Sequence, residues 1–136
     1  MKRTGTAHWE GDLRSGKGAL STQSTVLNQT QYSFKTRFED GVGTNPEELL
    51  AAAHAGCFTM AVSMILGQAG FTATALDTTA TVTLEGLAIT GVHLDIKGSV
   101  PNITLDQFQE MTKGAEQNCL ISKALSIPIT SEASLV

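Results

Sequence analysis

The sequence has few cysteines, prolines and aromatic residues. Among its 136 residues are 2 Cys, 3 Pro and 1 Trp, and aromatic residues make up 5%. The cysteines, Cys57 and Cys119, lie 62 positions apart with no Cys-x-x-Cys, so a thioredoxin-like motif and a cysteine zinc site are excluded. The 9 Lys and Arg residues are scattered and the net charge is −4, which argues against a nucleic-acid or membrane partner.

The sequence also lacks an uninterrupted apolar run long enough to span a membrane. Its most apolar segment, 49–66, lies inside the chain and contains His54, Thr59 and Ser63, which favours neither a membrane span nor a signal peptide. We therefore expect a cytoplasmic protein. With 41% hydrophobic and 16% charged residues, this length predicts one domain, 1–136.

The strongest local pattern predicts a long helix that carries Cys57. Asn45 is a good N-cap, Pro46 suits the first helical position, and Glu48 lies three residues after the cap, as in a capping box. Because the residues from 49 to 66 are apolar or small on nearly every side, we expect this helix to be central and buried. A length on the order of 36 Å suggests that it packs against a second subunit.

The rest of the chain predicts β-structure and two shorter helices. The expected strands are 6–10, 17–24, 31–38, 76–85, 87–100 and 127–130. The first three form an antiparallel meander, in which a period of two places Arg37 on the face opposite the aromatic residues. A capping box from Thr104 to Gln107 opens a helix that ends near Asn118, and a short helix follows at 119–125. The class is α+β in one domain.

The two thiols are the main candidates for chemistry, although each could also be a small buried hydrophobe. Cys119 follows Asn118, a plausible N-cap, and would lie in a first helical turn, where the helix dipole favours a thiolate. Burial among apolar residues disfavours a thiolate at Cys57, which therefore needs a cation to be reactive. Arg37 could supply that charge, and Glu47 could hold the guanidinium.

His54 lies three residues before Cys57, on nearly the same helix face, which would suit a general base or a zinc pair. Only His8 and His93 could add imidazole ligands, so we expect His54 to be an ordinary hydrogen-bonded histidine. Glu48 is expected to complement the helix dipole.

Two stretches resemble the signature of the OsmC/Ohr family of thiol peroxidases. They are Thr-Asn-Pro-Glu-Glu-Leu at 44–49 and Ala-His-Ala-Gly-Cys-Phe-Thr-Met at 53–60. Residues 7–12, 16–18, 26–28, 36–39 and 66–72 resemble the OsmC branch in particular. The resemblance implies an OsmC-like fold with antiparallel sheets and a long central helix. It also implies an intertwined homodimer with two active sites at the subunit interface.

The resemblance assigns roles to four residues. Cys57 corresponds to the peroxidatic cysteine, Cys119 to the resolving cysteine, Arg37 to the catalytic arginine and Glu47 to the glutamate that orients it. The implied reaction reduces organic hydroperoxides, and hydrogen peroxide less well, through a Cys57 sulfenic acid and a Cys57–Cys119 disulfide. A dithiol reductant, in this family a lipoyl-bearing protein, restores the thiols, and no metal or other cofactor is required.

One departure from the family pattern is that Leu120 replaces the proline that usually follows the resolving cysteine. Two other functions stay open. The chain could be a non-catalytic dimeric stress or ligand-binding protein with the same fold, or it could bind zinc through His54 and Cys57.

Overall fold

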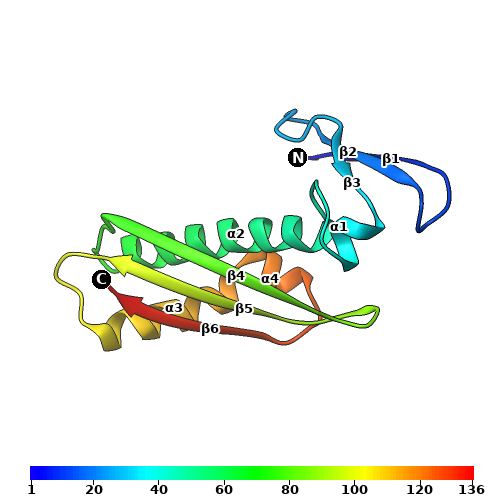
Figure 1. The fold of residues 1–136 in the computed structure, drawn as a ribbon. Coiled ribbons are helices and arrows are strands. Elements are labelled where there is room, and N and C mark those ends of the chain that lie inside the picture. Colours follow the sequence, from blue (N-terminus) through cyan, green and yellow to red (C-terminus); the bar gives the residue numbers. More distant parts are fainter. The chain divides into compact units, whose positions relative to one another are not determined.

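Three short strands open the chain as an antiparallel sheet in the order β1-β2-β3 (Figure 1). They are β1 Gly5–Glu10, β2 Lys17–Thr22 and β3 Thr30–Tyr32. The computed structural model describes residues 1–136 and divides them into two units, Met1–Leu49 and Leu50–Val136. The predicted N-terminal meander is confirmed, but its third strand is shorter than expected.

The third predicted strand is wrong after Tyr32, because the chain turns into the helix α1, Phe34–Phe38. Ser33 caps this helix: its hydroxyl accepts from the Thr36 N–H at 3.3 Å, and the Thr36 hydroxyl accepts from the Ser33 N–H at 2.8 Å. Arg37 therefore extends from a helix, and its guanidinium carbon lies 5.4 Å from the centre of the Phe38 ring.

The long helix α2, Pro46–Gln68, is confirmed. The Asn45 side chain accepts a hydrogen bond from the Glu48 N–H at 2.7 Å, as an N-cap does. The Glu48 carboxylate does not close the predicted capping box and instead accepts from the Thr44 hydroxyl at 2.7 Å. At the other end Gly70, with φ +88, takes the left-handed conformation that ends many helices.

The prediction that α2 is buried on nearly every side is wrong. In the unit Leu50–Val136, Phe58 and Val62 are fully buried, whereas Met60 is 75% exposed and Met64 is 51% exposed. By length and mean hydropathy, 1.8 over its most apolar window, α2 could cross a membrane. The core helix of a soluble protein meets the same test, and the buried side of α2 packs into such a core.

The second sheet has the order β4-β5-β6, with β4 Ala75–Glu85, β5 Ala88–Ser99 and β6 Ile129–Leu135. Gly86, with φ +60, allows the tight turn between β4 and β5, as predicted. β6 runs parallel to β5, so the expectation of purely antiparallel sheets is wrong for this pair. Pro128 lies just before β6, and the strand extends beyond the predicted range 127–130.

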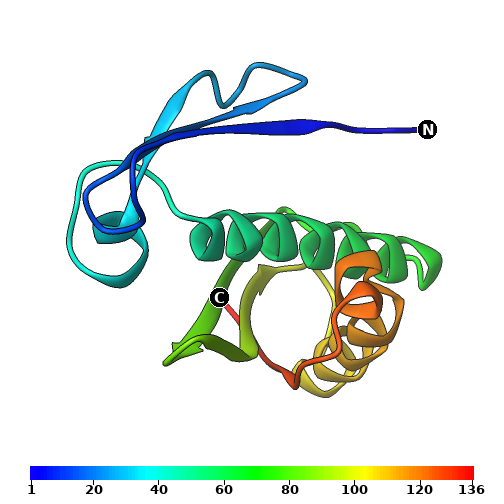
Figure 2. The same ribbon diagram turned by 90° about the vertical axis from the view of Figure 1, so that its right-hand side faces the viewer.

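Two helices, α3 Leu105–Asn118 and α4 Leu120–Ala124, connect β5 to β6. The predicted capping box is confirmed, because Thr104 and Gln107 exchange side-chain to backbone hydrogen bonds of 3.2 and 3.0 Å. Both α2 and α3 lie along the same side of the sheet (Figure 2), and their buried side chains meet those of β5 in one core. Gly98 of β5 makes room for this packing, since a Cβ there would lie 2.6 Å from the Phe108 ring.

Candidate active site

The two thiols lie together in the unit Leu50–Val136. Cys57 extends from α2 and is half-buried, Cys119 is fully buried between α3 and α4, and both are free cysteines. The Cys57 side chain lies near enough to Cys119 to lower the pKa of that thiol. Residues 62 positions apart meet because α2 and α3 pack on the same core.

Cys119 is itself the N-cap of α4, with φ −66 and ψ 122, so the expectation that Asn118 caps this helix is wrong by one residue. Burial raises the pKa of the Cys119 thiol more than any other single cause. Polar groups of Ser122, Cys57 and Ile121 act in the opposite direction and leave the pKa of Cys119 below its usual value, although the Cys119 side chain makes no capping hydrogen bond to the α4 backbone. The surroundings of Cys119 thus favour its thiolate.

His54 is fully buried on α2, and its Nε2 lies 2.7 Å from the Ser122 hydroxyl oxygen of α4. This contact confirms the expectation of a hydrogen-bonded histidine. Burial lowers the pKa of His54, so the ring is neutral near pH 7. Its Nδ1 is buried without a partner. Neither His54 nor Cys57 belongs to a group of three or more His, Cys, Asp or Glu side chains that could hold a metal ion.

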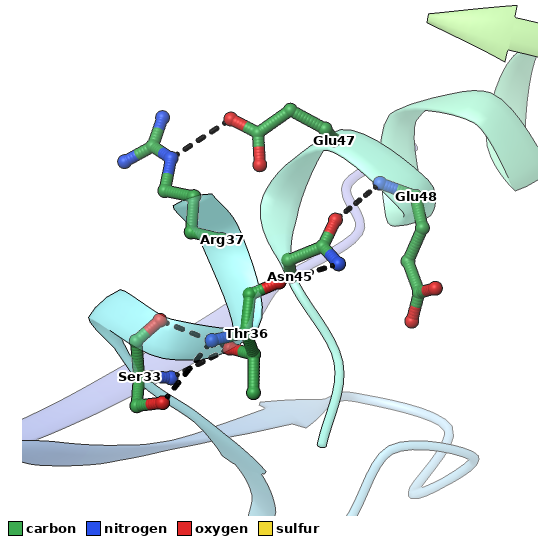
Figure 3. A network of polar contacts seen from close by, with 6 residues as sticks. All are labelled: Ser33, Thr36, Arg37, Asn45, Glu47 and Glu48. Atoms are coloured by element: carbon green, nitrogen blue, oxygen red, sulfur yellow. Dashed lines mark hydrogen bonds and ion pairs between the residues drawn. The ribbon is translucent and has the colours of Figure 1, made fainter. Parts of the chain in front are cut away.

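Arg37 and Glu47 form an ion pair in the unit Met1–Leu49 (Figure 3). The Arg37 Nε donates to Glu47 Oε1 at 2.8 Å, and the Arg37 and Glu47 side chains are 45% and 10% exposed. Glu47 Oε2 is buried without a partner. The two terminal nitrogens of Arg37 point away from Glu47 and remain available to a ligand.

Local hydrogen bonds hold the segments that carry this ion pair. The Asn45 side chain, which caps α2, also donates to the Thr36 carbonyl oxygen of α1 at 3.0 Å. This bond holds α1 against the start of α2. It therefore brings Arg37 and Glu47, which are ten residues apart in sequence, into contact. The same asparagine that sequence analysis identified as a cap thus also positions the ion pair.

Beside Arg37 lies a cavity of about 280 Å³ with an aromatic lining. The residues that line it are Trp9, Leu13, Tyr32, Ser33, Phe34, Arg37 and Phe38. Trp9 and Tyr32 pack edge to face, with ring centres 5.5 Å apart. Sequence analysis missed this cavity, although four of the seven aromatic residues of the chain lie before residue 39.

An α+β chain in which two free thiols lie in contact has the arrangement of a two-cysteine redox protein. A family model described as OsmC-like protein matches residues 38–133. The chain therefore belongs to the OsmC family.

Curated relatives and solved structures agree with this assignment. Peroxiredoxin OsmC of Escherichia coli (strain K12) is 50% identical over 139 aligned positions, which cover 99% of this chain and 97% of the relative, and Peroxiredoxin OsmC of Shigella flexneri gives the same values. The organic hydroperoxide resistance protein OhrB of Bacillus subtilis has a TM-score of 0.72 at 21% identity, covering 98% of both chains. An OsmC-like protein of unknown function from Vibrio cholerae has a TM-score of 0.74 at 14% identity, covering 98% of this chain and 99% of that one. The two structures support the fold alone.

Proposed function

We propose that this protein reduces organic hydroperoxides, and hydrogen peroxide less well, with Cys57 as the attacking thiol and Cys119 as the resolving thiol. The curated relatives at 50% identity are peroxiredoxins, and the enzyme class is that of a thiol peroxidase. The observation that carries the proposal is the contact between two free cysteines, one half-buried and one fully buried.

The reaction has two steps within the protein. The Cys57 thiolate attacks the distal oxygen of the hydroperoxide and the O–O bond breaks, so that Cys57 becomes a sulfenic acid. The departing alkoxide takes up the proton that the Cys57 thiol released and leaves as the alcohol. The Cys119 thiolate then attacks the Cys57 sulfur, the S–O bond breaks, and water leaves as the disulfide forms. A dithiol reductant, which we propose to be a lipoyl-bearing protein, restores both thiols by exchange.

In this proposal Arg37 stabilises the Cys57 thiolate and the negative charge that develops on the departing oxygen, and Glu47 orients Arg37. Three features support these roles. The guanidinium uses only Nε on Glu47, its terminal nitrogens are free, and the carboxylate that holds it is nearly buried. Arg37 would serve a Cys57 of its own subunit or of the partner subunit.

The aromatic cavity beside Arg37 supports a preference for organic substrates. An alkyl or aryl group placed there would bury apolar surface, at about 25 cal/mol for each Å² removed from water. Hydrogen peroxide has no such group and would gain nothing from the cavity. We propose that the organic part of the substrate binds against Trp9, Tyr32 and Phe34 while its peroxide group contacts Arg37.

We further propose that two copies form an intertwined homodimer through the exposed side of α2. Met60 and Met64 are exposed on it together with Gly56 and Gly67, so a second helix could approach closely. In such a dimer the two units of one chain belong to a single domain, 1–136. The exposed apolar residues of α2, Met60 and Met64, are then covered by the partner subunit. The expected location is the cytoplasm, where free thiols are kept reduced.

The test is consumption of tert-butyl hydroperoxide with a dithiol reductant. The Cys57→Ser variant should be inactive, and the Cys119→Ser variant should react once and then hold Cys57 as a sulfenic acid that a sulfenic-acid-specific probe labels. A wild-type protein that consumes no peroxide would favour the non-catalytic binding protein. A Cys57→Ser variant as active as wild type would overturn the assignment of Cys57.

A further inference from the structure

Two polar side chains are placed in the core next to Cys119, where the proposed reaction so far gives them no role. His54 is fully buried and Ser122 is half-buried. The His54 Nε2 and Ser122 hydroxyl are 2.7 Å apart, and Ser122 lies three residues after Cys119 and lowers the pKa of that thiol. Burying a polar side chain costs free energy unless the side chain forms a hydrogen bond. The hydrogen bond between His54 and Ser122 offsets this cost and fixes the orientation of both side chains.

The directions of these hydrogen bonds follow from the chemistry of the three groups. A thiolate has no proton to donate, so the Ser122 hydroxyl must donate to it. The hydroxyl oxygen is then free to accept, and a neutral His54 ring can donate from Nε2. This tautomer leaves Nδ1 without a proton. It agrees with the surroundings of Nδ1, where no group accepts a hydrogen bond from it. The two donors then point from His54 through Ser122 toward the Cys119 sulfur.

We propose that His54 and Ser122 are positioning residues for the resolving step, because their hydrogen bond joins α2, one turn before Cys57, to the short helix α4 beside Cys119, and directs the Ser122 hydroxyl toward the Cys119 sulfur. The inference rests on the proposed function. It adds residues that act on the second thiol only, whereas Arg37 and Glu47 are proposed to act on the first.

The chemistry of the step is balanced without any further reactant. The Cys119 thiolate attacks the sulfur of the Cys57 sulfenic acid, the S–S bond forms and the S–O bond breaks. The departing hydroxide takes the proton that the Cys119 thiol released, and water is the product. In this step Ser122 lowers the free energy of the thiolate by its hydrogen bond, and His54 keeps the Ser122 hydroxyl directed at sulfur.

Two lysines lie on the helices that flank Cys119. On α4 the neighbouring Lys123 is exposed, and on α3 Lys113 pairs with Glu116 at 3.6 Å. Ser122 and Cys57 are the two residues whose side chains lower the pKa of the Cys119 thiol. Leu120 stands where the family resemblance leads one to expect proline, and α4 still begins at that residue. Ser122 lowers the pKa of Cys119 more than any other group does, so it is the residue to change in a test of the second step.

The test is a single-turnover experiment with one equivalent of tert-butyl hydroperoxide, which separates formation of the Cys57 sulfenic acid from its loss to the disulfide. Ser122→Ala should leave the first step unchanged and slow the second by roughly 10- to 100-fold, as expected for losing a hydrogen bond to a charged group. Ser122→Thr, which keeps the hydroxyl, should recover the rate. His54→Phe should act like Ser122→Ala, and the double variant should be no slower than either.

Two controls give the outcome a clear meaning. Ser126→Ala makes the same chemical change at an exposed serine just after α4 and should resolve at the wild-type rate. His54→Gln keeps an N–H near the position of Nε2 and should be faster than His54→Phe. If the sulfenic acid forms and Ser122→Ala resolves it as fast as wild type, the inference is overturned while the proposed function stands. If no sulfenic acid forms in wild type or in the Cys119→Ser variant, the proposed function fails.

Discussion

The ion pair between Arg37 and Glu47 gives the sharpest test of how the proposed first step is activated. The perturbation is Glu47→Gln, which keeps an acceptor oxygen near Arg37 Nε and removes the charge. The bond to be weakened is 2.8 Å long, and the other carboxylate oxygen has no partner. A neutral amide in that place holds the guanidinium less firmly, so Arg37 spends less time in the position that the reaction needs.

The structure sets the size of the effect. A hydrogen bond between charged groups contributes about 1.5–3 kcal/mol when it is well shielded from water. Arg37 is 45% exposed, so solvent screening reduces this to about 1–1.5 kcal/mol. Since 1.4 kcal/mol corresponds to a factor of about ten, oxidation of Cys57 should slow roughly 5- to 10-fold. Arg37→Ala should slow it further.

The assay is rapid-quench measurement of Cys57 oxidation at limiting peroxide, with the rate taken from mass spectrometry of trapped protein. Glu48→Gln is the matched control, because Glu48 is the next residue of α2 and bonds to Thr44 rather than to Arg37. It should react within twofold of wild type. Glu47→Gln should have no additional effect in an Arg37→Ala background. A Glu47→Gln protein as fast as wild type, or one equally slowed in both backgrounds, would refute the reasoning.

The remaining predictions concern stability and assembly. Closing the 62-residue loop with a Cys57–Cys119 disulfide should raise the free energy of unfolding by about 4 kcal/mol in the chain-entropy model. Urea unfolding of the oxidised and the reduced protein measures this difference. Equal urea midpoints for the two forms would contradict the prediction. Because burial lowers the pKa of His54, the unfolded chain binds a proton there that the folded protein does not, so stability is complete above about pH 6.5 and falls below it. Urea unfolding at several pH values should show this loss, and His54→Gln should reduce it. Met64→Glu should convert the proposed dimer to monomers, as measured by analytical ultracentrifugation. Leu87→Glu, at a turn residue that is 93% exposed, should leave the dimer intact. A Met64→Glu protein that is still dimeric would exclude this interface.

Local signals in the sequence predicted the elements that local chemistry determines. Asn45, Thr104 and Gly86 each act on residues within a few positions, and the helix starts and the hairpin turn lie where these residues predict them. The segment 31–38 shows the limit of periodicity. Tyr32 and Phe34 fit a strand alternation, but Ser33 and Thr36 form a capping box that starts a helix instead. Ser33 is a residue type typical of an N-cap, but the alternating aromatic residues around it favoured a strand.

Features set by distant contacts could not be predicted from this sequence. The parallel pairing of β6 with β5 joins residues 37 positions apart, such as Val92 and Ile129, and no local residue specifies its direction. The hydrogen-bond partner of His54 could not be predicted for the same reason, because Ser122 lies 68 positions away in the sequence. The contact between Cys57 and Cys119 came from the family resemblance, and the fold provides its physical basis in a shared core.

The parallel pairing of β6 also has a consequence for the timing of protein synthesis. Cys119 lies in the crossover between β5 and β6, so its place beside Cys57 is fixed only after the last strand joins the sheet. Cys57 leaves the ribosome 62 residues earlier. At about 5–20 residues per second, each new chain spends roughly 3–12 seconds with Cys57 synthesised and Cys119 not yet made. Under the proposed function, a nascent Cys57 oxidised in that interval has no internal thiol to reduce it, so newly made chains would depend on outside reductants until Cys119 has been made.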